Sequence, residues 1–252
     1  LLQHKARRLM IEGGSLAALV MSVVVLAGVL RGITGFGGAM LMTPPLSILL
    51  GGIPAITIVL VLEAAAALIM VPSTYQDVPY RRLALLAIPA CLTVPIGSTL
   101  LTTLDPSMTR RLIGAVVVIF SLLLFSGVRL AYHPRQIWLV ATAAFGGVLL
   151  GATSIGAPPV IFLLLSGPDP TRITRAILTI FIGITSVVGL IATIVFSESG
   201  PPSLAWSVVL CALYLGSTYI GMKMFHRLND YGARVIALVL MLTFGTITIV
   251  LG

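Results

Sequence analysis

The sequence predicts an all-α integral membrane protein made of two homologous repeats, each a Gly-broken or re-entrant segment followed by three transmembrane helices. Three observations carry this prediction. The 252 residues are 58% hydrophobic and 9% charged, with a mean hydropathy of +1.15, far from the composition of a soluble globular domain. Apolar runs of membrane-spanning length follow one another along the chain. Two glycine-rich interruptions recur at a fixed spacing.

Eight apolar runs are separated by short polar gaps. A helix rises about 1.5 Å per residue and a bilayer core is about 30 Å thick, so one crossing takes about 20 residues. Six runs have that length, whereas the first and the fifth are too long for a single ordinary crossing. The runs cover residues 16–50, 53–75, 83–104, 112–130, 137–165, 173–196, 204–225 and 233–251.

The two long runs are interrupted at residues 32–38 and 151–157, and a proline pair follows each break. Gly151 lies 119 residues after Gly32, and Thr153 lies 119 residues after Thr34. The Gly-Ser-Thr triplets at 97–99 and 216–218 have the same offset. This spacing predicts an internal duplication. We expect an N-terminal tail at residues 1–14, a first repeat at 15–134 and a second repeat at 135–252.

Basic residues bear on whether the repeats are parallel or inverted. If each broken segment crosses once, the Lys and Arg residues divide evenly between the two sides of the membrane. If each is a re-entrant hairpin, Lys5, Arg7, Arg8, Arg110 and Arg111 oppose nine others, and the positive-inside rule favours this inverted arrangement with the nine in the cytoplasm. The parallel alternative stays open. The nine are Arg81, Arg82, Arg129, Arg135, Arg172, Arg175, Lys223, Arg227 and Arg234.

Other function classes find no support in the sequence. The formal charge of +8 does not indicate nucleic-acid binding, because the basic residues stand in short gaps and form no stripe with interleaved aromatics. Cys91 and Cys211 lie inside apolar runs, where a disulfide framework has no purpose. His4, His133 and His226 fall in the tail or the gaps, which leaves no imidazole within a span to activate a nucleophile or bind a metal. We expect no enzyme activity, no metal and no cofactor.

The two breaks are the candidate binding site. In hydrocarbon every backbone N–H and C=O needs a partner, so a Gly-rich break persists only when it is buried in protein or lines a polar cavity. A broken helix exposes N–H donors and a positive pole at the start of its second half, and glycine lets a ligand approach closely. This combination favours a small anion. The alternative is that the glycines only permit tight helix packing.

Two charged residues lie inside apolar runs. An unpaired Arg31, just before the first break, costs at least ~2.5 kcal/mol; a bound carboxylate, sulfonate or sulfite, snorkelling, or an ion pair with Glu63 would each offset this cost. Glu63 is the only acidic residue outside loops and tails, and Ile182 stands 119 residues after it. We predict that Glu63 carries a proton, because desolvation favours its neutral form while a nearby cation favours its charged form. A permanently ionised partner for Arg31 is the alternative.

Hydroxyl and guanidinium groups near the breaks are further candidates. The hydroxyls of Thr34, Thr43, Thr153 and Ser154 could donate to a substrate, or return hydrogen bonds to their own helix backbone. Arg172 and Arg175 follow the second broken segment, where they either guard a cytoplasmic entrance or set the topology.

The motif Arg31-Gly32-Ile33-Thr34-Gly35-Phe36-Gly37-Gly38 followed by Pro44, with Gly156-Ala157-Pro158-Pro159 in the second half, resembles the sulfite exporter TauE/SafE family of bacterial membrane proteins. The resemblance covers nearly the whole chain. It implies a transporter, usually considered an exporter, of sulfite, sulfoacetate or other sulfonates in the inner (cytoplasmic) membrane. Ser154 and Ala157 depart from the family pattern, in which glycine is common at both places.

From the residues and the resemblance together we expect alternating access around a mid-membrane anion site, with a passive anion channel as the alternative. The expected partners are a small anionic substrate and the lipid bilayer, and a homodimer is one candidate assembly. Glu63 is the expected proton-coupling residue. The expected substrate-binding residues are Arg31, Thr34, Gly35, Gly37, Gly38, Pro44, Thr153, Ser154, Gly156, Pro158, Pro159 and Arg175.

Overall fold

The computed structural model describes residues 2–127, 135–196, 204–224 and 230–251, with side chains described from residue 14 onward apart from 204–206, 230–234, 236 and 237. Secondary structure in this part is entirely helical, as predicted. The helices are α1 (Leu2–Thr34), α2 (Gly38–Leu50), α3 (Gly52–Met70), η1 (Val71–Ser73), η2 (Tyr75–Asp77), α4 (Tyr80–Thr103), α5 (Pro106–Phe125), α6 (Gln136–Thr153), α7 (Pro158–Leu165), α8 (Thr171–Phe196), α9 (Leu204–Met224) and α10 (Asp230–Leu251).

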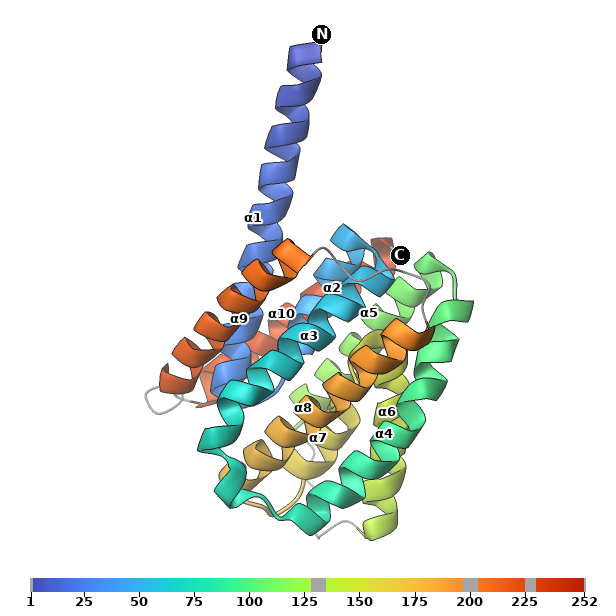
Figure 1. The fold of residues 1–252 in the computed structure, drawn as a ribbon. Coiled ribbons are helices and arrows are strands. Elements are labelled where there is room, and N and C mark those ends of the chain that lie inside the picture. The colour runs from blue at the N-terminus through green and yellow to red at the C-terminus, as the bar shows by residue number, and fades with distance from the viewer. Residues whose placement is uncertain (1, 128–134, 197–203, 225–229, 252) are drawn as a thin grey trace.

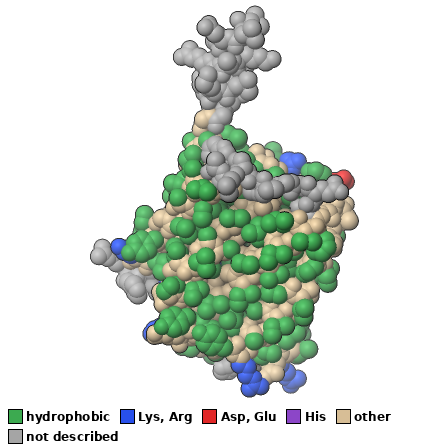
Figure 2. All heavy atoms as spheres, in the orientation of Figure 1, with side chains coloured by type: hydrophobic (Ala, Val, Ile, Leu, Met, Phe, Trp, Pro, Cys, Tyr) green, Lys and Arg blue, Asp and Glu red, His purple; other side chains and the backbone are tan. Residues whose placement is uncertain are grey.

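Seven of the described helices are long and apolar enough to cross a membrane. Two shorter apolar helices, α2 and the described end of α10, lie among them. α1 begins at Leu2, so it takes in most of the predicted tail, and its first turns project beyond the bundle (Figure 1). The outer face of the bundle is largely hydrophobic (Figure 2), with Leu68 76% and Leu92 73% exposed. Apolar side chains exposed over such an area fit lipid as the surrounding solvent.

Both long apolar runs are broken where the sequence predicts. α1 gives way to α2 after Thr34, and α6 gives way to α7 after Thr153. α1 enters the bundle from the end at which α3 begins, and α2 returns toward that end (Figure 1). α6 enters from the opposite end, and α7 returns toward it. Each broken segment is therefore a hairpin inside the bundle.

The hairpins place most of the described basic residues at one end of the bundle. Arg110 and Arg111 begin α5 at the end from which α1 enters. The starts of α4, α6 and α8 and the end of α9 lie at the opposite end (Figure 1) and carry Arg81, Arg82, Arg135, Arg172, Arg175 and Lys223. The remaining basic residues outside the spans and the three histidines lie outside the described side chains. They are His4, Lys5, Arg7, Arg8, Arg129, His133, His226, Arg227 and Arg234.

Glycines set the closest approaches between helices. α1 packs along α9, and α6 packs along α4. A Cβ on Gly32 would lie 2.7 Å from the backbone nitrogen of Met222 in α9, and a Cβ on Gly151 would lie 2.6 Å from that of Ser98 in α4. Main chains this close leave no room for a side chain. Gly32 and Gly151 thus act as packing residues.

Candidate functional site

The first break is closed by its own threonine. The Thr34 hydroxyl donates to the Leu30 carbonyl at 2.9 Å and accepts from the Phe36 N–H at 3.2 Å. Gly35 adopts a left-handed φ of 81°, and its N–H donates to the Arg31 carbonyl at 2.9 Å. A left-handed residue at this place ends a helix by satisfying its last carbonyls, and glycine adopts that conformation without a Cβ penalty.

The second break repeats this arrangement atom for atom. The Thr153 hydroxyl donates to the Leu149 carbonyl at 2.6 Å and accepts from the Ile155 N–H at 3.2 Å. Ser154 takes the place of Gly35, with a left-handed φ of 62° and an N–H that donates to the Leu150 carbonyl at 2.8 Å. Both threonine hydroxyls therefore bond to their own backbone, which is the alternative reading of these residues.

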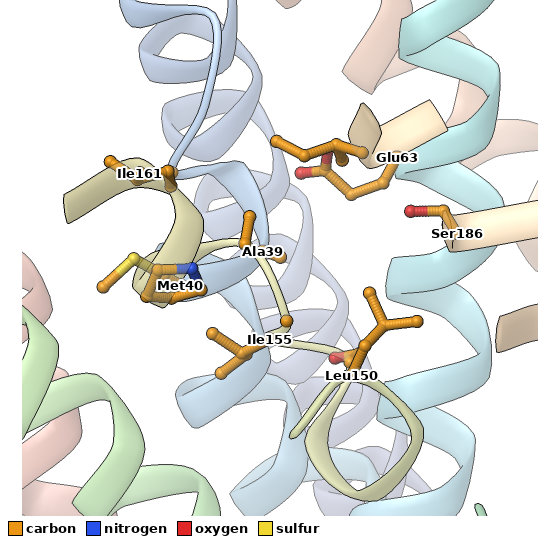
Figure 3. Close-up of a pocket in the computed structure, with 13 residues that line it drawn as sticks. Ala39, Met40, Glu63, Leu150, Ile155, Ile161 and Ser186 are labelled. Carbon is orange, nitrogen blue, oxygen red and sulfur yellow. The ribbon is translucent and has the colours of Figure 1, made fainter. Parts of the chain in front are cut away.

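A small buried cavity of about 20 Å³, room for about one water molecule, lies where the two breaks meet (Figure 3). The first hairpin contributes Gly37, Ala39 and Met40, and the second contributes Leu150, Ser154, Ile155, Gly156, Ala157, Pro158 and Ile161. Glu63 of α3 and Ile182 and Ser186 of α8 complete the lining. Five of the predicted site residues thus come together at one cavity: Gly37, Glu63, Ser154, Gly156 and Pro158.

The two half-helices offer unequal sets of donors to this cavity. Gly37, with a left-handed φ of 87°, caps α2, and the first N–H groups of a helix have no partner within it. Ala39 and Met40, in the first turn of α2, line the cavity. α7 instead begins with Pro158 and Pro159, which lack an N–H although they fit the first turn of a helix. The N–H groups that could donate to an anion at this cavity are therefore mainly those of the first turn of α2.

The proline pairs are not equivalent, although the sequence suggested that each follows its break in the same way. Pro44 and Pro45 lie buried inside α2, whereas Pro158 and Pro159 open α7. Pro44 is therefore away from the cavity lining. Its neighbour Thr43 links the hairpins, because the hydroxyls of Thr43 and Ser154 lie 3.0 Å apart.

Arg31 is held in a fully buried ion pair. Its side chain is 0% exposed, with Nε 3.0 Å from Oε2 of Glu63, and Nη1 donates to the Gly35 carbonyl. The Tyr214 hydroxyl, also buried, donates to Oε1 of Glu63 at 2.8 Å. Of the three ways to offset the cost of Arg31, the structure adopts the pair with Glu63. Glu63 lines the cavity, and Arg31 does not.

Arginines of the second half reach across to the first. Arg175, in the first turns of α8, donates from Nη2 to the Gly32 carbonyl at 2.6 Å, so it supports the first break. Arg172 pairs with Asp77 of η2 through Nε and Oδ2 at 2.6 Å. Arg82 of α4 pairs with Asp169, which precedes α8. These contacts place Arg172 and Arg175 at one end of the bundle.

Tyr214 and Ser186 were missed by sequence reasoning. Both stand in apolar spans where a single Tyr or Ser carries no spacing signal, and 151 residues separate Tyr214 from its partner Glu63. Only the packing of α9 and α8 against α3 brings them to the cavity region. No pattern in the sequence could have singled them out.

These features define a multi-pass helical membrane protein with two interrupted helices that meet at a small cavity, where the Glu63 carboxyl and the hydroxyls of Ser154 and Ser186 stand among apolar side chains. A model of the sulfite exporter TauE/SafE family matches residues 20–247. The chain belongs to that family of membrane transporters, which confirms the resemblance of its motifs. No curated protein and no solved structure matches the chain.

Proposed function

We propose that the protein is a secondary transporter, operating as an exporter, of a small sulfur-containing or organic anion such as sulfite, sulfoacetate or another sulfonate, in the inner (cytoplasmic) membrane. One observation carries the proposal: the first turn of α2, whose N–H groups have no partner within the helix, and the second break line a single small cavity between the two hairpins. An anion placed there meets the positive helix pole and, if Glu63 moves, Arg31. Glu63 is the proposed proton-coupling group, since it is the one acidic residue among the described residues that line the cavity.

Two inverted repeats, at residues 15–134 and 135–252, underlie the proposed mechanism. The matching hydrogen bonds of Thr34 and Thr153 support an offset of 119 between the broken segments. The helices that pack on the broken segments, α4 and α9, support a larger offset. A Cβ on Gly97 would approach the Ala152 nitrogen and the Val148 carbonyl, and a Cβ on Gly221 would approach the Val29 carbonyl.

Val148 follows Val29 by 119 residues, while Gly221 follows Gly97 by 124. Gly216, the predicted counterpart of Gly97, has nothing within 4 Å of a Cβ. Gly221, and not Gly216 of the second Gly-Ser-Thr triplet, therefore packs on its broken segment as Gly97 packs on the other. Opposite entry of the two hairpins (Figure 1) supports the inverted arrangement.

Alternating access requires each end of the bundle to open in turn. A cavity with room for one water is too small for sulfite, so we assign this conformation to an occluded state. Two ion pairs, Arg82 with Asp169 and Arg172 with Asp77, join the start of α4 and η2 to the start of α8 at the basic end. Each pair bridges the two repeats, so separating the repeats at this end breaks both.

We expect the double variant Asp77→Asn/Asp169→Asn to expose the cavity from the basic end. Arg172 is 77% exposed, whereas Arg82 and Asp169 are 17% and 15% exposed, so most of the loss of unfolding free energy should come from the pair of Arg82 with Asp169. Labelling of Ala157→Cys by an impermeant maleimide, in a chain with Cys91 and Cys211 changed to Ala, should speed up several-fold from that side. Asp105→Asn, at the other end, is the matched control, and equal labelling rates in both would refute the proposed gate.

Counterflow in proteoliposomes tests the proposed function. Vesicles loaded with unlabelled sulfoacetate or sulfite should transiently accumulate external labelled anion above its equilibrium level, because a carrier exchanges substrate across the membrane faster than it moves unloaded. A passive channel dissipates both gradients and gives no overshoot. Counterflow measured with a simple carboxylate such as acetate shows whether the protein distinguishes sulfur-containing anions from carboxylates. Absence of both overshoot and flux for every sulfur anion would remove the proposed function.

A further inference from the structure

The Glu63 carboxylate lies next to the start of α2. A Cβ built on Gly38, the first residue of α2, would lie 2.5 Å from Oε1 of Glu63 and 3.3 Å from the Cβ of Arg31, and it would collide with the Tyr214 hydroxyl. The carboxylate thus lies beside the first residue of α2, paired with Arg31 and bonded to Tyr214. The Glu63 carboxylate is thus a negative charge that the protein itself places beside the start of α2.

Few charged groups compete for this carboxylate. Arg31 of α1 and Tyr214 of α9 contact Glu63, α2 has no titratable residue, and α8 brings the uncharged Ser186 to the same cavity (Figure 3). Cys211 lies one turn before Tyr214 on α9. The remaining described basic side chains on helices that pack against α3 are bonded or placed elsewhere: Arg110, Arg111, Arg172, Arg175 and Lys223.

We infer that ionised Glu63 is a resident competitor of the transported anion, which takes its place against Arg31 and the α2 pole only after Glu63 has accepted a proton. This inference rests on the proposed function. Two negative charges at one buried cavity repel, and one guanidinium cannot neutralise both. Once Glu63 is neutral, Arg31 is left with an uncompensated buried charge that the arriving anion satisfies through charge-assisted hydrogen bonds.

The volume of the cavity also indicates that Glu63 must move before an anion binds. The cavity holds about one water, so a sulfonate group fits only if the Glu63 carboxyl turns away and adds its own volume. The proton comes from the aqueous phase that delivers the anion and leaves with it, when Glu63 ionises again and pairs with Arg31. One anion and one proton therefore move together in the same direction, and a monovalent anion crosses without net charge.

Proton uptake on anion binding is the direct test. Sulfoacetate is a suitable probe because its charge stays constant between about pH 6 and pH 8. When sulfoacetate is added to detergent-solubilised protein in weak buffer with an indicator dye, the wild-type protein should take up about one proton per anion bound at the alkaline end of this range. Its apparent affinity should fall by up to roughly tenfold per pH unit as pH rises.

Two variants separate competition from a merely structural ion pair. Glu63→Gln should bind sulfoacetate more tightly at about pH 8, with no proton uptake and no pH dependence. Tyr214→Phe removes a hydrogen bond to the charged carboxylate, so sulfoacetate should displace the carboxylate more easily and bind more tightly than it does to the wild-type protein at about pH 8. Asp105→Asn, which removes an exposed carboxyl outside the spans, should keep the wild-type profile.

The outcomes distinguish this inference from the proposed function. If the wild-type protein neither binds nor exchanges sulfoacetate or sulfite, the proposed function itself fails. If it exchanges the anion without proton uptake and with an affinity flat across the pH range, transport stands and the competition by Glu63 is overturned. A Glu63→Gln protein that elutes as an aggregate leaves the wild-type proton count and the affinity of Tyr214→Phe to decide.

Discussion

Replacing Arg31 by methionine is expected to lower the free energy of unfolding by about 3–5 kcal/mol, the largest loss of stability predicted for a single side chain of this protein. The change leaves the Glu63 carboxylate buried at 2% exposure, with the Tyr214 hydroxyl as its one remaining partner among the described residues. It also removes the Arg31 bond to the Gly35 carbonyl at the end of α1. Thermal unfolding in detergent, followed by size-exclusion chromatography, measures the loss.

The matched control is the double variant Arg31→Met/Glu63→Met. Removing both charges eliminates the desolvation penalty, and replacement of a buried pair by apolar residues is often neutral or stabilising by about 1–4 kcal/mol. The double variant should therefore be more stable than Arg31→Met while transporting nothing. If Arg31→Met alone melts at the wild-type temperature, the two groups are not buried together as the structure has them.

Local chemistry explains why the breaks could be predicted from the sequence. A run of apolar residues too long for one crossing, interrupted by glycine and threonine, specifies a helix end through contacts within four residues: Thr34 bonds to Leu30 and Phe36, and Thr153 bonds to Leu149 and Ile155. Such contacts depend only on the neighbouring sequence. The positions of both breaks and the inward location of Glu63 were predictable for this reason.

Long-range register was not predictable in the same way. The triplet match at 97–99 and 216–218 assumed a constant offset of 119. In the structure Gly97 packs against Val148 and Gly221 packs against Val29, so these packing positions on α4 and α9 are 124 residues apart. Ile182 was matched to Glu63 by the same rule, and the structure brings both Ile182 and Ser186 to the cavity. The offset of 119 residues relates the two broken segments, and it does not extend to the packing glycines of α4 and α9.

The two breaks differ in chemistry although they share a backbone. Sequence similarity at Gly-Thr suggested two equal cradles for an anion, but donor count depends on which residues open the second half-helix. Gly38 and Ala39 open α2 with free N–H groups, while Pro158 and Pro159 open α7 without them. The site is therefore asymmetric, with α2, Arg31 and Glu63 on one side and the hydroxyl of Ser154 on the other.

Replacing Gly38 by alanine is expected to reduce sulfoacetate counterflow by more than about tenfold, because one methyl group enters the space shared by Glu63 and Tyr214. The backbone of Gly38 is that of an ordinary helix start, so alanine costs nothing in conformation. The cost is steric: overpacking at a filled site is worth about 1–3 kcal/mol. The Glu63 carboxylate must shift from the α2 pole and from its bond to Tyr214.

Gly216→Ala is the matched control for Gly38→Ala. A Cβ on Gly216 meets nothing within 4 Å, and alanine in a helix interior is favoured over glycine by about 1 kcal/mol. This variant should keep wild-type counterflow and melt no lower than the wild-type protein. Because both changes add one methyl group to a helix, any difference between them isolates the contact with Glu63 and Tyr214. Wild-type counterflow in Gly38→Ala would mean that the start of α2 does not contribute to the anion site, and the pole with free donors would lose its proposed role.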